Sequence, residues 1–159
     1  MGEITIRQPH LVTQDSRAYA CTTLNDRPKS ASPEVFRVDS QGRISLILSL
    51  SGKIKPEGLP SDIDETFTIY ELTLANMEPN PTYLRQRDDL TRFKDAYQAA
   101  LRTLARECGQ CDTIHFFPAV PAPVAVFCGR ELLPKVDPKL LVYDFDKRQG
   151  GFTPTIEVN

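Results

Sequence analysis

A loop rich in hydroxyl groups follows an apolar segment near the first third of the chain. It reads Ser49-Leu-Ser51-Gly52-Lys53 and combines hydroxyls, free backbone amides and one ammonium. These are the groups that hold a phosphate. The loop is not a Walker A motif, because it lacks the G-x-x-x-x-G-K-[ST] pattern. The alternative is an ordinary turn. The loop therefore indicates phosphate binding only if other groups that bind phosphate lie near it.

A second loop, Asn76–Arg87, carries an aromatic ring and guanidinium groups close together. Tyr83 is suited to stacking on a base, and Arg85 and Arg87 are suited to pairing with phosphate. The alternative is a solvated loop in which Arg85 forms an ion pair with one of the two aspartates that follow it. The loop is therefore either a nucleotide-binding loop or a solvated connection at the surface.

A third segment, Phe117-Pro118-Ala-Val-Pro121, is small and rigid and precedes an expected helix. Such a turn lets a ligand approach the helix N-terminus. Phe117 is a second candidate for stacking on a base, and Pro118 and Pro121 would form the rim. The alternative is a tight turn that serves packing alone.

The remaining reactive side chains form no catalytic or metal-binding pattern. Cys108-x-x-Cys111 is a single pair at the expected end of a helix, where the dipole does not lower a thiol pKa. The two histidines lack zinc-ligand spacing, and His115 is expected to be a core or edge-strand residue. Asp144 and Asp146 share one strand face without further ligands nearby. We therefore expect no metal, no cofactor and no catalytic residue in this chain.

Length and charge narrow the functional class. A chain of 159 residues is normally one domain, and a net charge of −2 gives no long-range attraction to DNA or to anionic membranes. No apolar run approaches the ~20 residues that span a bilayer, and the N-terminus has no signal pattern. We expect a cytoplasmic protein with neither a membrane nor DNA as a direct partner.

Hydrophobic patterns predict alternating strands and helices from residue 43 onward. A helix is predicted over Asp88–Glu107, because its apolar residues recur with helical spacing, with Asp88 and Asp89 at its start and Gly109 as the C-cap. A second helix is predicted over Pro121–Leu133, whose prolines suit a first turn. Strands are predicted over Glu3–Ile6, around Val35–Val38 and over Ile44–Leu50, Phe67–Leu74, Thr113–Phe117, Leu140–Phe145 and Phe152–Val158, with a loop and a short helical turn over Lys53–Glu65.

This order of elements predicts the α/β class, with a mostly parallel sheet flanked by helices and an antiparallel C-terminal edge strand. Residues 1–42 are expected to be an extended and loop segment that ends an upstream half, and residues 43–159 the main unit. Ligands of open α/β sheets bind outside the carboxyl ends of the strands. The three candidate loops are all expected at that edge.

Several segments together resemble the SAVED domain, the sensor domain of bacterial anti-phage systems, which is related to the CARF domains of CRISPR ancillary proteins. The resemblance covers roughly residues 43–158, and its most specific part is Phe117-Pro-Ala-Val-Pro-Ala-Pro123 with the Gly-Arg pair that follows. The segments are Leu48–Ile54, Thr68–Leu72, Asp89–Phe93, Ile114–Val126, Gly129-Arg130 and Leu141–Asp144.

The resemblance implies a Rossmann-like, CARF-like fold in two fused halves that bind a cyclic di- or trinucleotide made by a cGAS-like nucleotidyltransferase. It also implies a fused effector such as a nuclease, a TIR domain or a protease, which ligand-induced homo-oligomerisation switches on. This chain departs from that pattern, because it carries no effector motif and is short for two halves. It is therefore expected to be the second half with the tail of the first, either as a fragment or as a separate subunit.

The leading hypothesis is a non-catalytic sensor of a cyclic oligonucleotide. In it the Ser49–Lys53 loop holds phosphate with help from Arg85, while Tyr83 or Phe117 stacks on a base. One alternative is an enzyme that cleaves its own cyclic ligand with positioned hydroxyls and cations. Another is an oligomerisation module indifferent to nucleotide, with Arg130 and the acidic edge of the last strands at an interface.

Overall fold

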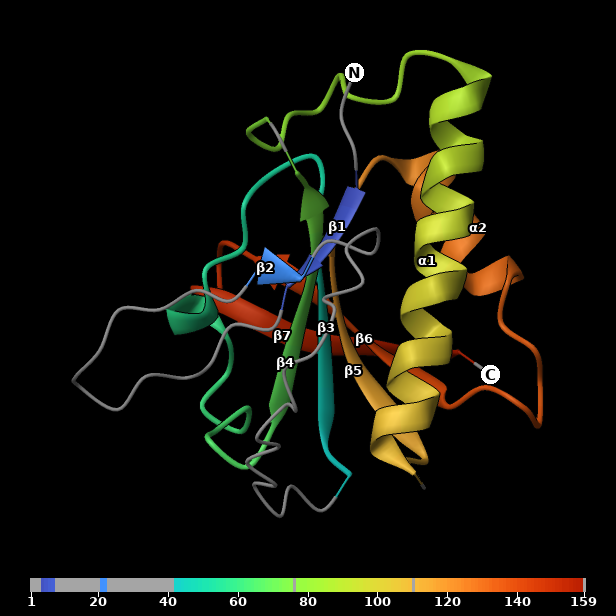
Figure 1. Cartoon of the computed structure of the whole chain (residues 1–159). Coiled ribbons are helices and arrows are strands. Elements are labelled where there is room, and N and C mark those ends of the chain that lie inside the picture. The colour runs from blue at the N-terminus through green and yellow to red at the C-terminus, as the bar shows by residue number, and fades with distance from the viewer. Residues whose placement is uncertain (1–3, 8–20, 23–41, 76, 110, 159) are drawn as a thin grey trace.

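A seven-stranded mixed sheet forms the centre of the molecule (Figure 1). The computed structural model describes residues 4–7, 21–22, 42–75, 77–109 and 111–158. Its elements are β1 (Ile4–Arg7), β2 (Cys21–Thr22), β3 (Ile44–Ser49), the 3-10 helix η1 (Pro56–Gly58), β4 (Thr68–Leu74), α1 (Arg87–Cys108), β5 (Thr113–Ala119), α2 (Ala122–Arg130), β6 (Lys139–Asp146) and β7 (Gly151–Val158).

The strand order is β2-β1-β4-β3-β5-β6-β7. The four central strands, β4, β3, β5 and β6, run parallel, whereas β1 and β7 are antiparallel to their neighbours β4 and β6. From β3 the chain passes to β4 on one side and then, through α1, to β5 on the other side. The order therefore reverses between β3 and β5. The predicted α/β class and the antiparallel C-terminal edge strand are confirmed.

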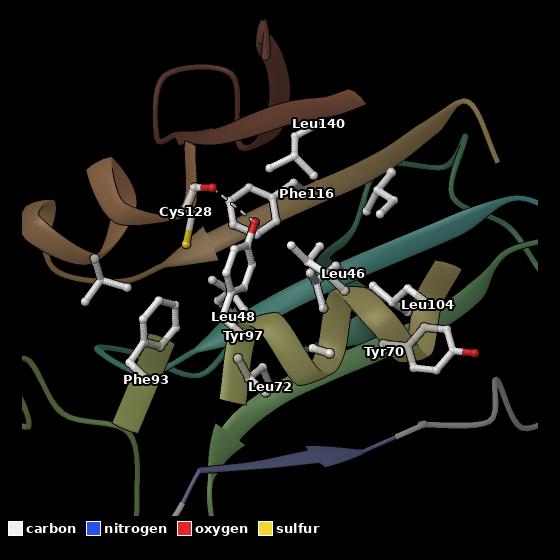
Figure 2. Close-up of a cluster of buried hydrophobic side chains, with 14 of the residues drawn as sticks. Leu46, Leu48, Tyr70, Leu72, Phe93, Tyr97, Leu104, Phe116, Cys128 and Leu140 are labelled. Atoms are coloured by element: carbon white, nitrogen blue, oxygen red, sulfur yellow. Dashed lines mark hydrogen bonds between the residues drawn. The ribbon is translucent and has the colours of Figure 1, made fainter. Parts of the chain in front are cut away.

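Both helices pack on the same face of the sheet (Figure 2). Alternate residues of β3, among them Leu46 and Leu48, point to this face and are fully buried. From α1 the hydroxyl of Tyr97 donates to the carbonyl oxygen of Cys128 in α2 at 3.4 Å, which ties the two helices together. The other buried members on this face include Tyr70, Leu72, Phe93, Leu104, Ile114, Phe116, Val124 and Leu140.

The opposite face of the sheet is covered by the long connection between β3 and β4. Ile54, Ile63 and Phe67 of this connection pack on Phe117 and Tyr143 of the sheet, and neither α1 nor α2 contributes a residue to that buried cluster. The prediction of a sheet flanked by helices therefore holds for one face, where α1 and α2 pack. The connection contains Pro56, Pro60, Gly52 and Gly58, which prevent a long helix, so that only the predicted short turn η1 forms.

The predicted boundaries agree with the structure to within a few residues. The N-cap of α1 is Gln86 rather than Asp88, because the Asp89 side chain closes a capping box with it. Gly109 ends α1 with a positive φ of 68°, as predicted for a C-cap. The segment around Val35–Val38 lies outside the described residues. β1 pairs with β4 in the same sheet, and the division of the chain at residue 42 stays a prediction.

A polar cluster lies on the face that the connection covers. His115, which the sequence predicts to be a core or edge-strand residue, is half-buried on the inner strand β5, and its Nδ1 lies 2.9 Å from the Tyr143 hydroxyl oxygen. The Phe67 ring meets the imidazole edge-on at a centroid distance of 4.9 Å. Burial and the nearby Arg43 guanidinium lower the pKa of His115, and the Asp62 carboxylate opposes them.

Because of this environment of His115, we expect the free energy of unfolding to decrease as the pH is lowered. Because the folded-state pKa lies below the ordinary value, the unfolded chain takes up the proton first as the pH falls below about 6.5. The urea midpoint is expected to fall between pH 7.5 and pH 5.5, a range in which ordinary carboxylates stay ionised. His115→Gln should flatten this dependence. An equal fall in the wild type and the variant would assign the effect to other groups.

Candidate ligand-binding site

Three loops at the carboxyl edge of the parallel strands are joined by backbone hydrogen bonds. The N–H groups of Leu50 and Ser51, just after β3, donate to the carbonyl oxygen of Ala119 at the end of β5, at 3.1 and 2.7 Å. The Asn80 N–H, from the loop before α1, donates to the Leu50 carbonyl oxygen at 2.9 Å. The three segments that the sequence singles out are therefore neighbours in space.

The first loop is anchored by a buried serine. Ser49 has no exposed surface, and its Oγ accepts a hydrogen bond from the Ile54 N–H at 3.2 Å. The Ser49 carbonyl oxygen accepts from the hydroxyl of Thr73 at 3.0 Å. The expectation that Ser49 itself holds a phosphate is revised, because its hydroxyl is inside the protein and fixes the path of the loop.

The next three residues of this loop differ in how far they are exposed. The Oγ of Ser51 is buried and has no hydrogen-bond partner among the described residues. No atom comes within 4 Å of the place where a Cβ on Gly52 would sit, so the backbone there is accessible. Lys53 is exposed. A hydroxyl, an uncovered backbone and an ammonium thus follow one another at the end of β3.

The second loop is held to the start of α1 by a carboxylate. Asp89 accepts the N–H groups of Arg85 at 3.0 Å and Gln86 at 2.9 Å, and these bonds lower the pKa of its carboxyl. The exposed Arg85 side chain uses its Nε to donate to the Thr82 carbonyl oxygen at 3.1 Å. The predicted contact between Arg85 and an aspartate therefore runs through the backbone amide.

Tyr83 lies half-buried in this loop, packed against the helix-side core. Its hydroxyl is buried and has no partner among the residues that the structure describes. Burial, with the nearby Cys128 and Asp89 as smaller causes, raises the pKa of the Tyr83 hydroxyl. Only part of the ring is therefore free to meet a base.

A small cavity of about 20 Å³ adjoins the Tyr83 side chain. Asp89 and Arg92 lie on its wall with 3.8 Å between Oδ1 and Nη1, and this volume is about that of one water molecule. Arg92 received no role from the sequence, although its position three residues after Asp89 places the two on one helix face. The other lining residues are Ile4, Leu74 and Met77.

The third segment contributes rigid backbone rather than an aromatic face. Phe117 has no exposed surface, since its ring stacks on Tyr143 at 4.4 Å and meets Phe152 edge-on at 5.3 Å. The expectation that it stacks on a base is therefore revised. Pro118 and Pro121 are half-buried, and Pro121 is the N-cap of α2, while their role at the rim of a site stays a prediction.

Within the described ranges, no cluster of three or more histidine, cysteine or acidic side chains could hold a metal ion. Over the same part of the chain, none of the helices combines the length and the apolar character that crossing a membrane requires.

Comparison with known proteins identifies the family. The model of the SAVED family, described as the SMODS-associated and fused to various effectors sensor domain, matches residues 1–158. This chain belongs to the SAVED family. The match extends to the N-terminal residues as well as to the residues 43–158 that carry the resemblance in sequence. A search of the curated proteins finds no match to this SAVED domain.

A solved structure shares the fold of this SAVED domain. It is the Acinetobacter baumannii Cap4 SAVED/CARF-domain containing receptor with the cyclic trinucleotide 2'3'3'-cAAA, at 16% sequence identity and a TM-score of 0.60. The likeness covers 76% of this chain and 25% of that receptor. This SAVED domain therefore corresponds in fold to about a quarter of the longer protein.

Proposed function

We propose that this chain is a sensing module that binds a cyclic di- or trinucleotide at the carboxyl edge of its parallel strands. Membership of a family of sensor domains supports a sensing role. The Cap4 receptor, which shares the fold, is described with a cyclic trinucleotide, and this supports the ligand class. In this proposal the module controls a fused effector of an anti-phage defence system of the CBASS type, through ligand-induced oligomerisation.

The observation that carries the proposal is the junction of three loops where the strand order reverses. Ligands of open α/β sheets bind in the crevice at such a point, outside the carboxyl ends of the strands. Here Ala119 at the end of β5 accepts two amides from the start of the β3–β4 connection. These hydrogen bonds hold the backbone of the loops together at this edge.

The side chains at this edge suit an anionic ligand with bases. Lys53 and Arg85 are exposed cations on two different loops, which suits a ligand with several phosphates. Gly52 offers an uncovered backbone next to Ser51, whose hydroxyl is buried and has no partner among the described residues. The exposed part of the Tyr83 ring offers a surface for a base. None of these groups is arranged as a nucleophile with a base, so the proposal is binding without catalysis.

A calorimetric titration of the full chain tests the proposal. With 2'3'3'-cAAA and cyclic di-AMP as probes, we expect saturable binding of at least one of them and none of linear AMP. The recovered probe should be intact by chromatography, whereas a linear product would favour the ligand-cleaving alternative. Light scattering should show a larger molecular mass of the protein particle only when the probe is present. A folded chain that binds neither probe would contradict the proposal.

A further inference from the structure

One aromatic side chain without an assigned role is exposed at the carboxyl edge of the parallel strands. Phe145, near the end of β6, is 50% exposed, and it is the one aromatic residue among the large exposed hydrophobic side chains of the described residues. A half-exposed phenylalanine leaves apolar ring surface in water. This position is therefore a candidate for contact with a planar apolar group.

The register of the strands places Phe145 beside the proposed site. Phe116 of β5 and Val142 of β6 form the last pair that joins these two strands, and Ala119 and Phe145 each lie three residues further along their strand. Ala119 is the residue whose carbonyl oxygen receives the Leu50 and Ser51 amides. Phe145 thus lies at the end of the strand next to that junction.

The ring of Phe145 is supported from inside the protein. It meets Phe152 edge-on, with 5.2 Å between centroids and an interplanar angle of 71°. Phe152 in turn meets the buried Phe117 at 5.3 Å and packs against the buried cluster to which Ile54, the residue that follows Lys53, belongs. This row of rings holds Phe145 in place, so that little side-chain freedom is lost when a ligand covers it.

The turn after Phe145 carries two cations beside the carboxylates of Asp144 and Asp146. Lys147 and Arg148 are exposed, and neither takes part in an ion pair within the described part of the chain. The carboxylate of Asp146 accepts the Arg148 N–H at 2.8 Å, which fixes the turn. An aromatic face next to unpaired cations is the combination by which proteins bind single-stranded nucleotides.

We infer that the β6–β7 hairpin is a further wall of the ligand site, on which Phe145 stacks against a nucleobase while Lys147 and Arg148 face the phosphates. The inference rests on the proposed function and adds to it a stacking residue in place of the buried Phe117. It also predicts that the bound ligand reaches from the Ser51–Lys53 loop across the end of β5 to this hairpin.

The test compares Phe145→Leu, Phe145→Tyr and Ile156→Ala in the full chain, titrated with 2'3'3'-cAAA. Loss of the aromatic face in Phe145→Leu is expected to weaken binding about 5- to 150-fold. Phe145→Tyr, which keeps the ring, and Ile156→Ala, which changes another exposed apolar residue of the hairpin, should bind like the wild type. A 2-aminopurine analogue of the probe should lose its stacking quench only in Phe145→Leu.

The outcomes separate this inference from the proposed function. Wild-type binding together with equal affinity and equal quench in Phe145→Leu would overturn the stacking role and leave the sensor in place. Unchanged affinity with a smaller particle in light scattering would assign Phe145 to a protein interface and would also overturn it. A wild-type protein that binds no cyclic nucleotide would contradict both the stacking role of Phe145 and the proposed sensor function. Thermal melting of each variant verifies that it is folded.

Discussion

Phe93→Ala is expected to lower the free energy of unfolding by about 3–5 kcal/mol. Phe93 has no exposed surface, and its ring stacks on Tyr97 with 5.6 Å between centroids (Figure 2). The truncation removes buried apolar surface and leaves a cavity between α1 and the sheet. Domains of this size are stable by only about 5–15 kcal/mol, so the loss would be a large fraction of the total.

Urea denaturation followed by circular dichroism measures this effect. Arg102→Ala is the control on the same helix, because the side chain is exposed and its loss should change stability by less than about 0.5 kcal/mol. A loss below about 1 kcal/mol in Phe93→Ala would mean that α1 is not packed as described. The result also bears on function, since α1 begins at the loop that carries Tyr83 and Arg85.

Lys53→Ala is expected to weaken binding of a cyclic oligonucleotide by roughly 10- to 150-fold, the range for loss of a hydrogen bond to a charged group. Lys53 is an exposed cation next to Gly52, where the backbone is uncovered and a phosphate can approach. The same titration with 2'3'3'-cAAA measures the loss. The dependence of the affinity on salt should also decrease, because one phosphate contact is removed.

Lys55→Ala is the matched control for this change. Lys55 is also exposed, lies two residues further on and carries the same charge, so its removal alters the net charge of the protein equally. A clear loss with Lys53→Ala and little change with Lys55→Ala would place a phosphate at the end of β3. Equal effects of the two variants would indicate general electrostatic attraction and would argue against a specific contact by Lys53.

The sequence determined the elements and their order because both are local properties. The apolar residues alternate along Ile44–Leu50 and recur with helical spacing along Asp88–Glu107. Both patterns arise from the period with which side chains return to one face of a strand or a helix. The prolines before Val124 indicated the start of α2, and the structure begins that helix at Ala122. The shared position of the three candidate loops was also predictable, because each is next to the carboxyl end of a predicted parallel strand and these ends share one edge of the sheet.

Only the tertiary structure decided which side chains at that edge can meet a ligand. Ser49 and Phe117 lie on the face that Ile54, Ile63 and Phe67 cover, so their burial depends on where the connection between β3 and β4 packs against the sheet. Such burial leaves no periodic signal in the sequence. Phe145, near the end of β6, keeps half of its surface in water.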